Sequence, residues 1–482
     1  MFDLPNPEHK IKVGLFGIGL DAYWNQFEGL RDRLVGYQST IAQRLSRPNV
    51  EVVDVGLVDN PLKARDAAQT LKREDVSVIF LYVSTYALSS TVLPVVQKAN
   101  APVVVLNLQP VSAIDYGTFN ALGDRTKMTG EWLAHCQACS VPEIANAFRR
   151  AGIQFHQITG VLNNDPIAWG EIDAWIEATR TAEIMRNNRV GLLGHYYNGM
   201  LDIYSDPTQH ATTFGCHIEH VEMCELKELS DMATEEQVRS KLDEIFRHFD
   251  VRSDCDPADL ERAARTAFAL DQLVERHALG SMAYFFNGTG DPAYVDLISS
   301  VIVGNSMLTA RGVPIAGEYE VKNVQAMKIM DAFGAGGSFT EFYAMDFDAD
   351  VILMGHDGPG HIAIADGPTK LRPLDVFHGK VGKGLSVEMS VRRGPVTLLS
   401  VVDSDPSGEL SLLVAEGESV SGPILEIGNT NSRYKFPLGA RGFVDAWCAE
   451  GPAHHCAVGV GHIADKIEKF GQIVGIKTKR VC

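Results

Sequence analysis

The first 150 residues alternate fully apolar runs with helical stretches, and this alternation restricts the fold more than any other feature. Runs such as 11–20 and 50–58 carry apolar residues on both faces, which is typical of strands buried in a parallel sheet. Helical segments between such strands supply the crossover connections. The sequence therefore predicts a doubly wound α/β domain, with strands at 11–20, 50–58, 76–84 and 101–109 and helices at 24–46, 61–73 and 88–98.

The pattern then repeats and finally changes. A second α/β unit is expected to begin near residue 155, with strands at 189–200 and 217–226 and two charged amphipathic helices over 234–277. From about residue 346, short strands with partial alternation are separated by Gly, Pro, Asp and Ser, which favours an antiparallel sheet that closes into a small barrel.

The expected fold is α/β, with two doubly wound parallel-sheet domains followed by a C-terminal antiparallel β-barrel domain. A chain of 482 residues with 45% hydrophobic content is long enough for several cores. The expected boundaries are 1–175 for the N-terminal α/β domain, 176–325 for the central α/β domain and 326–482 for the barrel.

Composition narrows the class of partner. Sixty-one acidic residues against 43 basic ones give a net charge of −18, which argues against nucleic acid or an anionic membrane as a partner. No run approaches about 18 apolar residues without a charge, and the first residues lack a signal-peptide pattern. Eight cysteines are too few for a disulfide scaffold in so long a chain, so reduced thiols and a cytoplasmic location are expected.

A set of acidic and histidine residues in the last third of the chain predicts a catalytic metal site. Two carboxylates and two or three imidazoles, each set among Gly, Pro or small apolar residues, suit a mixed nitrogen and oxygen site for a divalent metal of the manganese type. Four side-chain ligands would leave two positions of six-coordinate Mn²⁺ open for substrate oxygens. The residues are Glu318, Glu341, His356, His454 and His455.

The assignment of these residues as ligands has competing interpretations. Glu318 taken alone suits a helix start, where the macrodipole favours an acid. His356 competes with His361 for the ligand role, and His356 is favoured. Successive side chains on an extended segment point to opposite faces, so only one of His454 and His455 is expected to bind the metal.

The four segments resemble the L-arabinose isomerase and L-fucose isomerase family of metal-dependent aldose–ketose isomerases. Family members carry a G-E-x-[DE]-V-K segment, an S-F-x-E-x-Y segment, a Gly-flanked His after a short strand and a late G-x-x-H-H. This chain has them in the same order, as residues 317–322, 338–343, 355–356 and 451–455.

The resemblance implies an intramolecular oxidoreductase that interconverts an aldose and its ketose through a cis-enediol. Glu318 and Glu341 would act as ligands and proton carriers, and His356 and His455 as the other ligands of Mn²⁺, with Co²⁺ or Mg²⁺ as alternatives. His454 would contact the substrate or handle a proton. The family also implies a homotrimer or homohexamer with intersubunit active sites.

Two further segments are candidate sugar contacts. Gly17, Gly19 and Ala22 form a GxGxxA after a strand, for which a tight turn is a better interpretation than NAD binding. The resemblance implies that this loop reaches a neighbouring subunit's sugar, with Asp21, Tyr23 and Trp24 as the contacts. A basic stretch over 370–393 holds Lys380, Lys383 and Arg392; it either decorates the barrel surface or binds an anionic sugar.

Three alternatives follow from these features. The protein could be an isomerase specific for an anionic hexose such as sulfoquinovose, in which case Lys383 and Arg392 would bind the anion. A non-catalytic sugar-binding protein would share the two α/β domains but would need neither the carboxylate and histidine set nor the barrel. A metallohydrolase could use the same ligands, and its two products would distinguish it from an isomerase.

Overall fold

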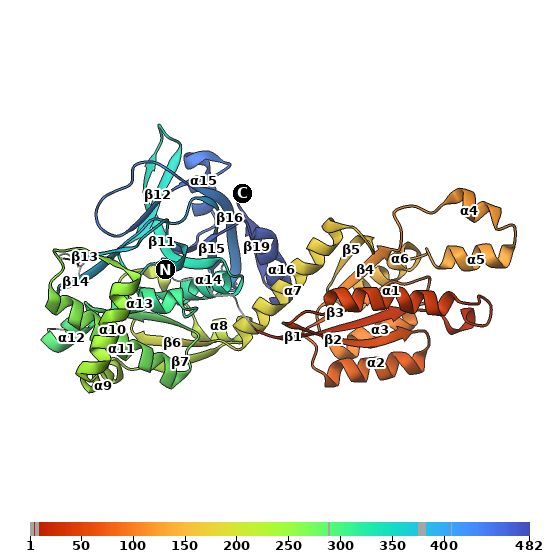
Figure 1. The fold of residues 1–482 in the computed structure, drawn as a ribbon, viewed down its shortest axis with the longest axis horizontal. Helices are drawn as coiled ribbons and strands as arrows, with labels where there is room; N and C mark the ends of the chain where they lie inside the picture. The colour runs from red at the N-terminus through yellow and green to blue at the C-terminus, as the bar shows by residue number, and fades with distance from the viewer. Residues whose placement is uncertain (1–3, 5–8, 288–289, 375–381, 406) are drawn as a thin grey trace. The chain divides into compact units, whose positions relative to one another are not determined.

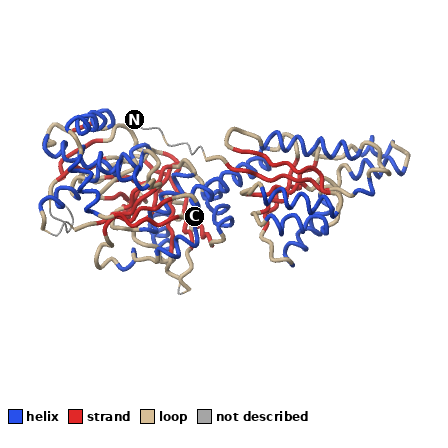
Figure 2. Tube along the Cα trace, turned by 90° about the horizontal axis from the view of Figure 1, so that it is seen from below, coloured by secondary structure: helices blue, strands red, loops and turns tan. Residues whose placement is uncertain are grey.

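The computed structural model describes the chain except for residues 1–3, 5–8, 288–289, 375–381 and 406. Its contacts divide the chain into two compact units, Glu8–Glu183 and a larger one that contains Ile184–Cys482. Figure 2 shows the strands of each unit with helices around them. The division into three domains at 175 and 325 stays a prediction.

The unit Glu8–Glu183 is built on a parallel sheet of five strands in the order β2-β1-β3-β4-β5. The four strands expected from the apolar runs are present, and a fifth, β5, lies at the edge beside β4. The strands are β1 (Ile11–Ile18), β2 (Val50–Val58), β3 (Val78–Tyr82), β4 (Val103–Gln109) and β5 (Phe155–Val161). The helices are α1 (Leu30–Leu45), α2 (Pro61–Arg73), α3 (Ser89–Ala99), α4 (Tyr116–Ala121), α5 (Arg125–Leu133), α6 (Val141–Arg150) and α7 (Pro166–Arg186), which runs on into the larger unit.

The helix expected at 24–46 begins only at Leu30. The short helix η1 (Asp21–Tyr23) and a turn precede it, and its N-cap is Gly29 in the left-handed region at φ 77°. The periodic apolar residues therefore predicted the helix correctly, but its first turn was placed too early because Gly29 interrupts the chain there.

The unit Ile184–Cys482 contains a second parallel sheet, in the order β10-β9-β6-β7. Figure 1 labels its neighbouring strands β6 and β7. Its strands are β6 (Arg189–Gly194), β7 (His217–Val221), β9 (Ser281–Phe285) and β10 (Ile315–Ala316). The helices around it include η3 (Leu201–Ile203), α8 (Pro207–Phe214), α9 (Met223–Met232), α10 (Glu235–His248), α11 (Pro257–His277), α12 (Pro292–Ile298) and α13 (Val301–Ala310). The segment Pro292–Ala310 is long and apolar enough to cross a membrane, but 78% of its apolar window is buried, as expected of a core helix.

Six antiparallel strands of the same unit form the closed β-barrel that the sequence predicts. The order β15-β18-β11-β12-β17-β16 closes because β15 also pairs with β16. They are β11 (Gly336–Asp346), β12 (Val351–His356), β15 (Gly394–Val402), β16 (Ser411–Val420), β17 (Thr430–Lys435) and β18 (His455–Val460). The flanking elements are β19 (Lys477–Arg480), α15 (Gly439–Cys448), α16 (Ala464–Val474) and a small sheet of β8 (Asp250–Val251), β13 (Lys370–Leu374) and β14 (Gly384–Glu388).

Helix α14 (Val321–Ala332) joins the second sheet to the barrel. Every residue of this helix is buried, although it contains two lysines, an aspartate and two amides. It follows β10 and packs against β11, β15 and β18. Figure 1 shows α14 beside β11 and β15. The loop between β10 and α14 therefore lies where the carboxyl ends of a parallel sheet meet the barrel strands, a position at which open α/β sheets place ligands.

Candidate metal and active site

The loop that carries Glu318 has an unusual backbone. Glu318 and Tyr319 both lie in the left-handed region, at φ 58° and 63°, which costs free energy for residues other than glycine. Hydrogen bonds hold the loop in this conformation: Tyr319 N–H donates to Tyr284 O at 2.9 Å and Tyr197 N–H donates to Glu318 O at 3.3 Å. Such enforced strain is frequent at functional sites, and here it fixes the direction of the Glu318 side chain.

The barrel brings the other predicted residues together through strand register. Glu341 on β11 lies opposite His455 on β18 and opposite Gly355 on β12, and His356 ends the same β12 strand. Residues directly opposite each other in an antiparallel pair extend to the same face of the sheet. Three segments that are distant in the sequence therefore meet at one end of neighbouring strands.

Three imidazoles surround the Glu318 carboxylate, and each turns its Nε2 atom toward it. The distances from Glu318 oxygens are 3.2 Å to His455, 3.7 Å to His454 and 3.9 Å to His356. In the part of the chain that the structure describes, Glu318, His454 and His455 form the group whose ligand atoms all lie within 4.8 Å of one another. A mixed set of one carboxylate and imidazole nitrogens fits a divalent transition metal.

The two adjacent histidines do not diverge as the sequence suggested. Their ring centroids are 3.8 Å apart, and both rings face Glu318. The expectation that they would point to opposite faces was wrong because β18 begins only at His455, so His454 lies before the regular strand.

Each of these rings is held by a carboxylate at its other nitrogen. His455 Nδ1 is 2.6 Å from Glu320 Oε2, and both side chains are 1% exposed. His454 Nδ1 is 2.6 Å from Asp202 Oδ2. A carboxylate on the far nitrogen is the usual way to fix the orientation of a metal-binding histidine. Phe339 adds packing, with its ring 4.3 Å from His455 and 4.4 Å from His356 between centroids.

Burial and charge set the protonation of the site. Burial lowers the pKa of His455 well below its ordinary value, so this ring is neutral, as a metal ligand must be. Burial also raises the pKa of Glu320 to about 8, against the nearby charge of Lys322. Burial by itself would lower the pKa of His454, but the hydrogen bond to Asp202, together with the negative charges of Asp202, Glu320 and Glu318, raises it.

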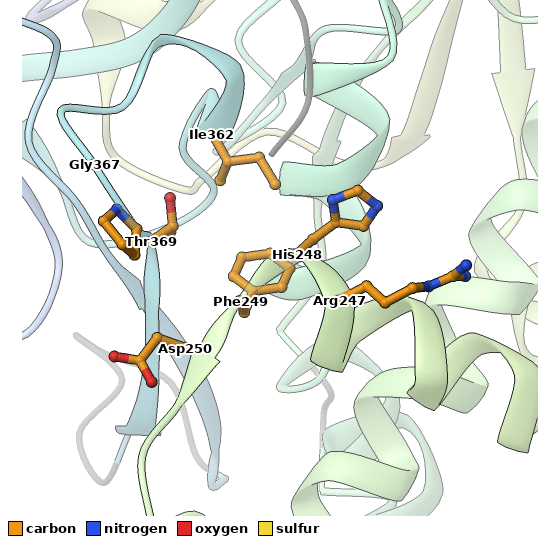
Figure 3. Close-up of a pocket in the computed structure, with 8 residues that line it drawn as sticks. Arg247, His248, Phe249, Asp250, Ile362, Gly367 and Thr369 are labelled. Atoms are coloured by element: carbon orange, nitrogen blue, oxygen red, sulfur yellow. The ribbon is translucent and has the colours of Figure 1, made fainter.

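A cavity of 290 Å³ opens beside these residues. Asp202, Glu341 and His454 line it together with an apolar part, Phe342, Trp447, Cys448, Pro452 and Ala453. Its size and mixed lining suit a small polar ligand. Another cavity, of 270 Å³, lies between the end of α10 and the small sheet (Figure 3). There the charged side chains of Arg247 and Asp250 point away from each other, so the cavity beside His454 is the better candidate for chemistry.

Other predicted residues have separate surroundings. His361 is fully buried, its ring nitrogens have no hydrogen-bond partner among the described residues, and burial lowers its pKa to about 4. Its Nε2 lies beside Gly336, the first residue of β11. His356, at 3.9 Å from Glu318, is better placed as a ligand.

The basic residues of the 370–393 stretch are engaged or exposed. Lys370 and Arg372 pair with Glu388, and Arg392 Nη2 donates to Ala363 O at 2.8 Å. Lys383 is exposed. Lys380 lies outside the described residues. The described lining of the cavity beside His454 contains no lysine or arginine.

The three N-terminal candidates belong to the unit Glu8–Glu183, and their role as sugar contacts stays a prediction. Asp21 and Tyr23 form η1. Trp24 Nε1 donates to Asp59 at 2.9 Å, and Asp59 also pairs with Lys63 at 2.7 Å. Asp59 follows β2, the position at which a dinucleotide-binding domain places the acid that binds the ribose. The Asp59 side chain is 1% exposed and already contacts Trp24 and Lys63, which does not favour NAD binding.

Sequence reasoning missed Asp202 and Glu320. Glu320 could have been found, since it is the second acid of the segment that contains Glu318. Asp202 gave no signal, because it lies more than 100 residues before Glu318 in a loop that reaches the site only through the tertiary fold.

Comparisons with known proteins agree with the C-terminal part of this description. Residues 336–477 match the family model of the L-arabinose isomerase C-terminal domain, which supports a relationship to arabinose isomerases. No curated protein matches the chain. One matching solved structure is an ABC transporter periplasmic solute binding protein from Actinobacillus succinogenes 130z with bound D-allose. It has 12% identity, covers 60% of this chain and 82% of its own, and has a TM-score of 0.18, too low to support an argument.

Proposed function

We propose that this protein is a metal-dependent aldose–ketose isomerase. One observation carries the proposal: three imidazoles turn Nε2 toward the Glu318 carboxylate, next to a cavity lined by Glu341. The match of residues 336–477 to the arabinose isomerase C-terminal domain supports the same class of reaction.

The donor set fits a divalent cation. Glu318, Glu341, His356 and His455 would hold it, with Glu320 fixing His455 from behind. Mn²⁺ suits this mixture of oxygen and nitrogen donors, with Co²⁺ or Mg²⁺ as alternatives. A bound cation supplies a Lewis acid that polarises the sugar carbonyl and acidifies the neighbouring C–H.

The protein's own groups then move the proton. Glu318 and Glu341 transfer it between C2 and C1 of the open-chain sugar through a cis-enediol, one as base and the other as acid. His454, which is partly exposed at the cavity, contacts a substrate hydroxyl or carries a proton. The apolar side of the cavity excludes water from the reacting carbons.

A product assay over pentoses, 6-deoxyhexoses and anionic hexoses with added Mn²⁺ tests the proposal. An isomerase converts one sugar to another of the same mass, whereas a metallohydrolase gives two products. Binding of a sugar without any conversion, in the presence of Mn²⁺, Co²⁺ or Mg²⁺, would favour the alternative of a sugar-binding protein.

We also propose a homotrimer or homohexamer in which a neighbouring subunit completes the site with Asp21, Tyr23 and Trp24. The resemblance to the isomerase family supports this assembly. Light scattering gives the oligomeric state, and mixing a Trp24→Ala variant with a Glu341→Gln variant tests the shared site. Recovery of activity in the mixed oligomer is expected, because some sites would receive both intact halves.

A further inference from the structure

Asp202 contacts two segments that are distant in the sequence, Lys322 of helix α14 and His454 just before the barrel strand β18. It belongs to η3, in the loop that follows β6. Its backbone carbonyl accepts a hydrogen bond from Lys322 Nζ at 2.5 Å, and the same Nζ pairs with Asp403 at 2.7 Å. Lys322 is 3% exposed and belongs to the buried helix α14, so the η3 turn is fixed to the core of the site.

One carboxylate oxygen of Asp202 holds His454 twice. Oδ2 accepts from the backbone N–H of His454 at 2.9 Å and lies 2.6 Å from the ring Nδ1. These two contacts fix both the main chain and the ring. When Nδ1 faces Asp202, Nε2 is left to face Glu318 at 3.7 Å.

The contact between Asp202 and His454 contributes little to the stability of the fold. The side chains of Asp202 and His454 are 39% and 37% exposed, and an ion pair at that exposure contributes little to the free energy of unfolding. What the contact does determine is the direction of a ring that lines the cavity.

We propose that Asp202 is a positioning residue that orients His454 toward the substrate cavity and ties this orientation to the loop after β6. The inference rests on the proposed isomerase function. It predicts that Asp202 acts through His454 and is not itself a metal ligand.

A double-mutant cycle on the full-length enzyme tests this. Removal of an outer carboxylate that orients a histidine in a metal site typically costs about 10–100-fold, so Asp202→Ala should lower kcat by that order while KM for the sugar stays nearly unchanged. Asp202→Asn keeps an acceptor oxygen and should restore most of the rate. Asp202→Ala combined with His454→Ala should be no slower than His454→Ala alone. Multiplicative losses in the double variant would overturn the proposal.

Two readouts do not need isomerase activity. Titration with Co²⁺, followed by visible absorption, should give a similar affinity for Asp202→Ala and wild type, and a loss as large as that of His455→Ala would mean that Asp202 is a ligand. Diethyl pyrocarbonate should modify His454 faster in Asp202→Ala, because Nδ1 is uncovered; equal rates would contradict the orientation role.

The control is Asp206→Ala in the same segment. Asp206 caps α8 through Thr208 N–H and should leave the kcat and the His454 modification rate unchanged. If wild type converts no sugar, the proposed function fails. The modification rate of His454 would then still decide whether Asp202 orients that ring.

Discussion

Glu320 and Glu318 contact the two ring nitrogens of the same residue, His455. Glu320 Oε2 is 2.6 Å from Nδ1, and Glu318 Oε2 is 3.2 Å from Nε2. The two acids are separated by Tyr319 alone, and the left-handed backbone at Glu318 and Tyr319 lets their side chains reach opposite edges of the imidazole. The loop therefore sets the orientation of the ring and supplies a ligand beside it.

Replacement of Glu320 by Gln should weaken metal binding. The substitution leaves the volume nearly unchanged but removes the charge that would orient His455 and increase its basicity. Outer carboxylates of this kind contribute on the order of 10–100-fold to metal affinity or activity. Calorimetric titration with Mn²⁺ measures the effect, and exposed Glu409 offers a control in Glu409→Gln. Unchanged affinity would show that Glu320 only fills space.

Metal affinity should rise with pH. Burial raises the pKa of Glu320 to about 8, so below that pH the carboxyl group holds a proton. A cation at His455 Nε2 requires Nδ1 to keep its hydrogen and donate it to an ionised Glu320, so binding must release this proton. The affinity should increase as pH approaches about 8 and level off above it. Calorimetry in buffers of different ionisation enthalpy counts the protons; zero release at pH 7 would contradict the assignment.

Glu341→Gln should nearly abolish turnover while the fold is kept. Glu341 lines the cavity on β11, and the substitution removes an anionic ligand and a proton carrier together. General acid and base groups contribute about 10²–10⁴-fold, so kcat should fall by at least that order. Circular dichroism checks the fold. A loss of less than tenfold would leave Glu341 a structural role only.

Alanine variants of the individual histidines should differ in the amount of metal they retain. His356→Ala and His455→Ala should lower Mn²⁺ occupancy, measured by mass spectrometry of the metal after dialysis. His361→Ala should leave occupancy unchanged, although it leaves a cavity where a fully buried ring was and should lower the melting temperature. Equal metal loss in the His361 variant would contradict the choice of His356 over His361 as the ligand.

The sequence predicted the fold class well because its strongest signals are local. Apolar runs such as 11–18 and 50–58 became strands of a parallel sheet, and the alternating C-terminal strands closed into a barrel. The late start of α1 was missed because Gly29 stops the helix while the apolar spacing continues. Strand β5 was missed because its half-exposed residues give no continuous apolar run.

The site was predictable only in part, for a related physical reason. Glu318 and His356 each follow a glycine, and His455 ends the G-x-x-H-H segment, so the positions of these three residues carried information. Asp202 is an ordinary loop acid whose partner is 252 residues away, and no local pattern indicates that contact. The direction of the two adjacent histidines depended on where β18 starts, which the sequence did not define.

The enzyme should prefer a neutral sugar to an anionic one. The cavity beside His454 is lined by Asp202 and Glu341 and, among its described residues, by no cationic side chain, so an anionic sugar would meet like charge there. Arg392 is bonded to the Ala363 carbonyl, and Lys383 is exposed. A neutral pentose or deoxyhexose should therefore be converted with a higher kcat/KM than a sulfonated or phosphorylated hexose, and Lys383→Ala and Arg392→Ala should change this ratio little. Preference for the anionic hexose, reduced by either substitution, would instead place the basic stretch at the substrate, since a guanidinium or ammonium bond to a sulfonate is charge-assisted.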